Sequence, residues 1–209
     1  MTKITERGMI FNADMVRALL DGRKTQTRRI MKDQPVLNGN FYEVFGAAWS
    51  KGMTSIPAVP GHSLSAKCPF GAVGDRILVR ETWAEAGAGA PELKLYRANY
   101  PAHVPSHYEN VPPAEEIRWT PSIHMPRCAS RILLEITDVR VERLNSISEE
   151  DAGKEGYPAD PSPFGGHMDK WLWFRQLWDG IYPEQSFKHN PWVWVIGFKR
   201  IEGAGHETD

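Results

Sequence analysis

The sequence has 209 residues, and its 25 Lys and Arg nearly balance its 26 Asp and Glu, which leaves a formal net charge of -1. This length suits a single domain with a sizeable hydrophobic core. The near-neutral charge argues against a protein that holds long nucleic-acid duplexes by bulk charge, because contacting many phosphates requires a clustered excess of Lys and Arg.

The first predicted element is a short helix over residues 12–22. Asn12 is a suitable N-cap, apolar residues recur four positions apart, and Gly22 stands where a helix commonly ends. A basic and hydroxyl-rich segment, residues 23–30, leaves this helix. Its conformation is not fixed by the pattern.

Two long segments, residues 31–72 and 84–122, are interrupted by many prolines and are predicted to be mostly loop. Irregular stretches of this length often carry function, and they can hide short strands that no clear pattern reveals. Between them, the Gly-Asp pair at 74–75 predicts a turn, and the β-rich run at 76–83 predicts a strand.

The C-terminal half has clearer patterns. Alternating apolar residues over 130–141 predict one long strand bent near Asp138, or two strands that meet there. Together the patterns predict an α+β fold with a small barrel or curled sheet. The other predicted elements are a short capped helix at 148–156, a helix with an aromatic face at 168–180, a buried strand at 191–198 and a disordered tail at 202–209.

The segment GRKTQTRR at 22–29 is the most informative motif. Neighbouring cations and partial burial would lower the pKa of Lys24, and a neutral lysine could take the proton of Thr27 and make it a nucleophile. In a straight strand the two side chains point to opposite faces, because their offset is odd. They converge only if the segment bends or forms a helical turn. The alternative is a solvated basic turn.

Five segments resemble the ASCH family of the PUA-like superfamily. Residues 17–30 (RALLDGRKTQTRRI) are similar to its opening signature, residues 74–81 (GDRILVRE) to its strand after a Gly-Asp turn, and residues 147–156 (ISEEDAGKEG) to its short acidic helix. The segments WTPSIHMPR (119–127) and NPWVWVIGF (190–198) resemble ASCH proteins encoded by phages and prophages.

The resemblance implies one PUA-like domain over residues 1–201, a small β-barrel with flanking helices and a cleft near the first helix. It touches both ends of the chain and most of the predicted regular structure. It does not cover the two long loops, which are therefore expected to be insertions at about 31–72 and 84–122.

The resemblance also implies a reaction. Some short ASCH proteins are amidohydrolases that deacylate N4-acetylcytidine with a Lys, a Thr and a Glu. The matching positions here are Lys24 as base, Thr27 as nucleophile and Glu155 as the group that orients Lys24 or activates the deacylating water. Arg29 could stabilise the oxyanion. No cofactor is implied, and the scattered histidines lack metal-site spacing, so we expect no metal site.

Weaker candidates for contact with a small nucleoside-like ligand lie near the motif or at the ends of predicted strands. An aromatic side chain can stack on a base, and Arg can bind base edges or phosphate. The other tryptophans, mostly between 171 and 194, are expected in the core. The candidates are Arg23, Arg29, Arg80, Glu81, Trp83 and Arg127.

Other functions remain open, because ASCH members also include nucleic-acid-binding modules and ribonucleases. The alternatives are a non-catalytic PUA-like module for RNA or DNA, including single-stranded nucleic acid, and a phage accessory protein with a vestigial cleft. The first is favoured by the cations at 23–29 together with Arg80, Arg127 and Arg131. Two isolated cysteines, no visible signal peptide and no run of roughly 18 apolar residues predict a cytoplasmic protein without membrane contact.

Overall fold

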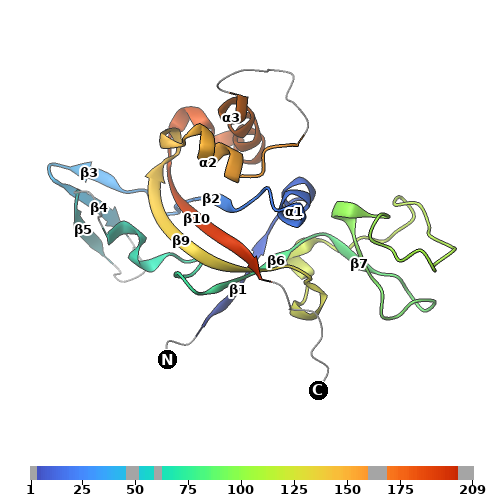
Figure 1. Cartoon of the computed structure of the whole chain (residues 1–209). Coiled ribbons are helices and arrows are strands. Elements are labelled where there is room, and N and C mark those ends of the chain that lie inside the picture. Colours follow the sequence, from blue (N-terminus) through green and yellow to red (C-terminus); the bar gives the residue numbers. More distant parts are fainter. Residues whose placement is uncertain (1–3, 46–51, 59–62, 160–168, 202–209) are drawn as a thin grey trace.

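The computed structural model describes residues 4–45, 52–58, 63–159 and 169–201. It is an α+β fold. The main sheet has the strand order β1 (Glu6–Ile10), β6 (Arg76–Arg80), β9 (Leu133–Arg143), β10 (Trp192–Ile201) and β2 (Gln26–Ile30). In this sheet β1 and β6 are parallel and the other neighbours are antiparallel. The strands β9 and β10 curve strongly through the centre of the molecule (Figure 1).

The main sheet is curled, but no backbone ladder joins its edge strands β1 and β2 among the described residues. A side chain connects these edges instead. Arg29 of β2 donates a hydrogen bond of 2.8 Å to the carbonyl oxygen of Ile10 in β1, and its guanidinium lies over the ring of Phe11. Of the two sheet forms predicted, the described strands therefore form the curled sheet rather than a closed barrel.

The predicted helices are present, with caps that explain their bounds. The helix α1 (Ala13–Leu20) begins where the Asn12 side chain accepts a hydrogen bond from the backbone of Met15, and Gly22 after its end has a φ of +72°. The short helix α2 (Glu149–Lys154) has Ser148 as its N-cap. The third helix is α3 (Asp169–Ile181), and none of the helices in the described ranges is long and apolar enough to cross a membrane.

The strand β10 separates two hydrophobic cores, as its apolar residues on both faces predict. Since side chains alternate along a strand, Val193 and Val195 pack with α2 and α3, while Trp194 and Ile196 face the main core. The bend predicted near Asp138 is a bulge, because the pairing of β9 with β10 shifts register there.

The tryptophans expected in the core divide into two groups. Trp178, Trp192 and Trp194 are buried, whereas Trp171 and Trp173 on α3 are half-buried. The difference arises because α3 packs through one face only, the one that carries Phe174 and Trp178.

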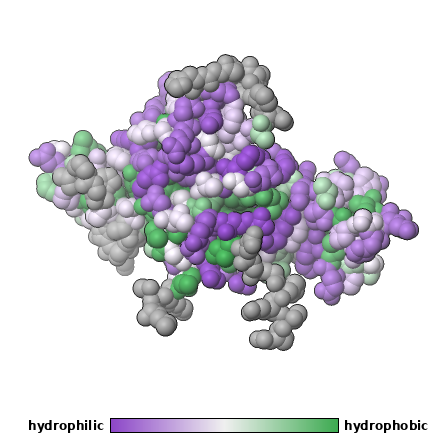
Figure 2. All heavy atoms as spheres, viewed as in Figure 1, coloured by the Kyte–Doolittle hydropathy of each residue, from purple (hydrophilic) through white to green (hydrophobic). Residues whose placement is uncertain are grey.

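The two segments predicted to be mostly loop contain strands. Residues 31–72 hold a three-stranded sheet that projects from one side of the molecule (Figure 1). This sheet carries exposed hydrophobic residues (Figure 2). Its strands are short and separated by turns, so their alternation is too brief to recognise in sequence. The added elements are β3 (Val36–Asn38), β4 (Phe41–Phe45), β5 (Met53–Pro57), β7 (Trp83–Glu85), β8 (Lys94–Tyr96) and the 3-10 turns Ser63–Lys67 and Arg97–Asn99.

The first strand was not predicted either. Only Met9 is buried in β1, so the segment has no alternating hydrophobic pattern. Asp75 anchors it from the turn before β6, accepting hydrogen bonds from the backbone of Thr5 and the side chain of Arg7. The predicted tail at 202–209 lies outside the described residues.

Candidate active site

Lys24 and Glu155 form a buried ion pair beneath the surface of the domain. The Lys24 Nζ lies 2.9 Å from Glu155 Oε2 and also donates a hydrogen bond of 2.8 Å to the Glu155 carbonyl oxygen. Their side chains are 0% and 3% exposed. Two residues separated by 131 positions in the chain thus lie in contact, as the resemblance to the ASCH family implies, while their catalytic roles stay a prediction.

The backbone around the pair explains why it forms. After Gly22 the chain turns, and the amide of Lys24 donates to the carbonyl oxygen of Ala18 in α1. Lys24 then makes an isolated antiparallel bridge with Glu155, which is the C-cap of α2. Gly156 permits this approach, because its φ is +103° and a Cβ there would lie 2.8 Å from the Ala18 Cβ.

Thr27 is buried, with 2% of its surface exposed. It belongs to β2, whereas Lys24 lies in an isolated bridge just before that strand. Within the described chain no hydrogen bond joins the Lys24 ammonium to the Thr27 hydroxyl. Thr27 and Glu155 line the same small pocket of about 20 Å³, which Met15 and Leu177 also border.

The environment of Lys24 lowers its pKa. Burial is the largest cause, because it disfavours the ammonium. Glu155 opposes this by attraction and hydrogen bonding, while repulsion from Arg29 and Arg28 adds to the lowering. The direction agrees with the prediction that neighbouring cations and burial favour the neutral amine.

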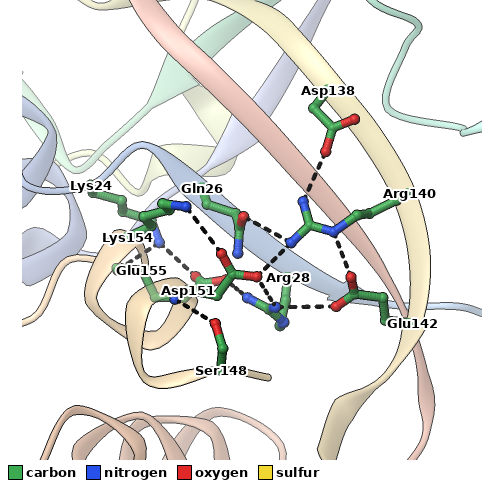
Figure 3. A network of polar contacts seen from close by, with 10 residues as sticks. All are labelled: Lys24, Gln26, Arg28, Asp138, Arg140, Glu142, Ser148, Asp151, Lys154 and Glu155. Carbon is green, nitrogen blue, oxygen red and sulfur yellow. Dashed lines mark hydrogen bonds and ion pairs between the residues drawn. The ribbon is translucent and has the colours of Figure 1, made fainter. Parts of the chain in front are cut away.

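Arg28 joins Lys24 in holding the carboxylate of Glu155 (Figure 3). Its Nη1 lies 3.1 Å from Glu155 Oε1, and its Nη2 lies 3.3 Å from both Glu142 and Asp151. This residue was part of the recognised cation cluster but not among the predicted site residues. The alternation of β2 could have identified it, because Arg28 must face away from Thr27 and Arg29.

Two predicted ligand contacts lie beside the pair. Arg23 donates hydrogen bonds to the carbonyl oxygens of Gly156 and Tyr157 and lines a pocket of about 450 Å³. This larger pocket shares Met15, Glu155 and Leu177 with the small one. Its other walls include the half-buried ring of Trp173 on α3. Arg29 lines the small pocket while its side chain connects the two sheet edges.

The other four predicted contacts border neither of these pockets. Glu81 is buried and makes two hydrogen bonds to the Arg131 guanidinium, of 2.9 and 3.0 Å. Trp83 is 8% exposed and packs against Met125 and Ala129 in a small separate core. Arg80 packs over Gly8, and Arg127 is paired with Glu6. Their contact with a ligand stays a prediction.

The side chains of the site offer general acid–base and nucleophilic groups. Across the described ranges no three His, Cys, Asp or Glu residues are grouped so that they could hold a metal ion. Lys24, Thr27 and Glu155 bring an amine, a hydroxyl and a carboxylate to this region, all of them buried.

Comparison with family models and with curated proteins finds no match. Among solved structures, the chain is similar to an ASCH domain from Lactobacillus crispatus JV V101, with 14% identity, a TM-score of 0.42, and coverage of 94% of this chain and 79% of the other. It is also similar to protein EF3133 from Enterococcus faecalis V583, with 9% identity, a TM-score of 0.41, and coverage of 100% and 88%. One of these two solved structures is that of an ASCH domain, the family that the sequence resembles.

Proposed function

We propose that this protein is an amidohydrolase that removes the acyl group from a modified nucleoside or nucleobase similar to N4-acetylcytidine, on a curled PUA-like sheet. The observation that carries the proposal is the buried Lys24–Glu155 pair, whose Glu155 lines a small pocket together with Thr27. A buried lysine with a lowered pKa can act as a base, and Thr27 supplies the hydroxyl that it would activate.

The reaction begins with neutral Lys24, which takes the proton of the Thr27 hydroxyl as the Oγ1 bonds to the amide carbonyl carbon. The carbon–nitrogen bond then breaks, and the Lys24 ammonium returns the proton to the leaving amine. This leaves an ester on Thr27. Hydrogen bonds of this kind commonly shorten only when substrate binds, so the Lys24 amine need not already contact Thr27 in the free protein.

A water molecule completes the cycle. It attacks the ester carbon while its proton passes to Lys24, the bond to Thr27 Oγ1 breaks, and the proton returns to that oxygen. Glu155 orients Lys24 in both steps through its 2.9 Å contact. The carboxylic acid is released, and Lys24 is again a neutral amine.

The larger pocket supports a nucleoside-sized substrate. Its volume of about 450 Å³ lies within the range of small-molecule sites, roughly 300–1,000 Å³. Trp173 supplies an aromatic face on which a base can stack, and Arg23 supplies a positive charge in the same pocket. Glu155 borders both this pocket and the small pocket that Thr27 lines, so the two pockets are neighbours.

The test is hydrolysis of free N4-acetylcytidine by the full-length protein and by Thr27→Ala. We expect the variant to lose at least about 10²-fold in kcat, because it has no nucleophile. Thr25→Ala is the matched control, since its side chain is exposed two positions away, and it should retain wild-type turnover. Turnover by Thr27→Ala at the wild-type rate would exclude the nucleophile assignment.

The alternative of a nucleic-acid-binding module receives less support from the cations that suggested it. Arg28, Arg127 and Arg131 are each paired with a carboxylate, which offsets their charge towards phosphate. A salt titration of oligonucleotide affinity tests this alternative, because phosphate contacts produce a steep loss of affinity with salt. Tight, salt-dependent binding without any turnover would favour the binding module, and inactivity in both assays would favour a phage accessory protein.

A further inference from the structure

The carboxylate of Glu155 is shared between two cations. Lys24 Nζ contacts Oε2 at 2.9 Å, and Arg28 Nη1 contacts Oε1 at 3.1 Å. All three side chains are almost completely buried, so water does not screen their charges. Because each oxygen has its own cation, Lys24 does not receive the full attraction of the Glu155 charge.

Arg28 is itself fixed from two other elements (Figure 3). Its Nη2 lies 3.3 Å from Glu142 on β9 and 3.3 Å from Asp151 on α2. Arg140 binds the same two acids at 2.5 and 2.6 Å, so their charge is divided between two guanidinium groups. The Arg28 guanidinium cannot turn away from Glu155 without breaking several ion pairs. Its position next to Glu155 is therefore fixed by these contacts.

We propose that Arg28 is a positioning residue, which fixes the Glu155 carboxylate between two cations and thereby favours the neutral, proton-accepting form of Lys24. It need not touch the substrate, since it acts through Glu155 and through its own charge. The role in turnover rests on the proposed function, whereas the effect on Lys24 protonation does not.

Other charged groups around the pair define how the test must be controlled. Lys24 faces Glu155 from α2 and the two arginines, Arg28 and Arg29, from β2. Removing Arg28 leaves the Glu155 carboxylate to Lys24 alone, so Lys24 should hold its proton more tightly. The charged residues around Arg28 are Glu155, Asp151 and Lys154 from α2, and Glu142, Arg140 and Asp138 from β9.

The first measurement is the pH dependence of kcat/KM for N4-acetylcytidine. In Arg28→Met, the limb that rises with pH should move to higher pH by about one unit, which lowers the rate on that limb about tenfold. In Arg28→Lys, which keeps a cation, the limb should move less than it does in Arg28→Met. Arg140→Met is the control, because it removes a guanidinium of the same network that does not contact Glu155, and its limb should stay in place.

The second measurement does not depend on turnover. The Lys24 13Cε chemical shift, assigned by its loss in Lys24→Gln, reports protonation in the full-length protein. We expect its titration midpoint to be higher in Arg28→Met than in the wild type. Arg28→Gln serves as a second neutral variant if the Met variant does not fold.

The two proposals fail in different ways. If a folded neutral variant keeps the wild-type Lys24 titration, the role of Arg28 is overturned whether or not the protein is an enzyme. If no acylated nucleoside is hydrolysed but the Lys24 titration moves upward, the proposed function fails and the inference about Arg28 holds.

Discussion

Lys24 is fully buried and yet carries an ion-pair partner, and these two conditions act on it in opposite directions. Burial lowers its pKa, and the contact with Glu155 raises it, with burial the larger effect. Gly156 makes the arrangement possible, because only a residue without a Cβ fits against Ala18 and Lys24 at a φ of +103°. The contact between Lys24 and Glu155 thus depends on the glycine at position 156.

The protonation of Lys24 predicts how activity depends on pH. Because the neutral amine is the active form, kcat/KM for N4-acetylcytidine should rise with pH through the titration of Lys24. This rise should lie below the ordinary lysine pKa of about 10.4, since the pKa is lowered in the folded protein. The check is a pH–rate profile with the Lys24→Met variant beside it, in which the limb should disappear. A wild-type rate that falls with pH over this range would contradict the role of Lys24 as base.

The helix α2 is short, but it presents two acids to the site. Asp151 and Glu155 are four positions apart, so both face Arg28, and Glu155 stands at the C-cap where the chain turns back to Lys24. A helix of six residues has little stability of its own, and its ends are therefore important. Ser148 accepts a hydrogen bond from the backbone of Asp151 at the first turn.

Removing this cap should weaken the element that carries Glu155. We expect Ser148→Ala to lower the free energy of unfolding by about 1 kcal/mol, because one helical amide loses its acceptor. Urea denaturation monitored by circular dichroism measures the change. Ser146→Ala, an exposed serine just before the helix, should change stability by less than about 0.5 kcal/mol. Equal effects of the two substitutions would show that the cap does not stabilise α2.

At the scale of the whole molecule, acids with lowered pKa values connect distant segments. The carboxylate of Asp75 links the N-terminal strand to the turn before β6, and hydrogen bonds from the backbone amides of Thr5 and Ala72 are the main causes of its lowered pKa. Burial raises the pKa of Asp151, but attraction to Arg140 and Arg28 outweighs it and the pKa is lowered. Both acids therefore stabilise the folded state in their ionised form.

These shifts predict a loss of stability in acid. Above the ordinary Asp pKa of about 3.9 the stabilisation is complete, and it is lost as the pH falls through the lower folded-state values, because the unfolded chain binds protons more readily. The free energy of unfolding in urea should therefore decrease between about pH 5 and pH 2. Asp75→Asn should be less stable at neutral pH and should show a smaller decrease. An identical pH dependence in the variant would contradict the role of Asp75.

Local signals in the sequence were enough to predict much of the fold. The Asn12 and Ser148 caps, the alternation in β9 and the two-sided hydrophobicity of β10 each act over a few residues, and they produced the elements expected. The β3–β5 sheet and the strand β1 were not predictable in this way. Their stability comes from pairing with other strands rather than from a hydrophobic pattern of their own.

The sequence by itself determined which groups are available for chemistry: a lysine, a threonine and a set of cations in one segment, and an acidic segment more than 100 positions away. Only the tertiary structure decided that Lys24 and Arg28 share Glu155, while Arg29 connects the sheet edges and Glu81 pairs with Arg131. The reason is physical. The charge on each side chain follows from its residue type, but its partner depends on the strand register, the turn at Gly22 and the close approach at Gly156.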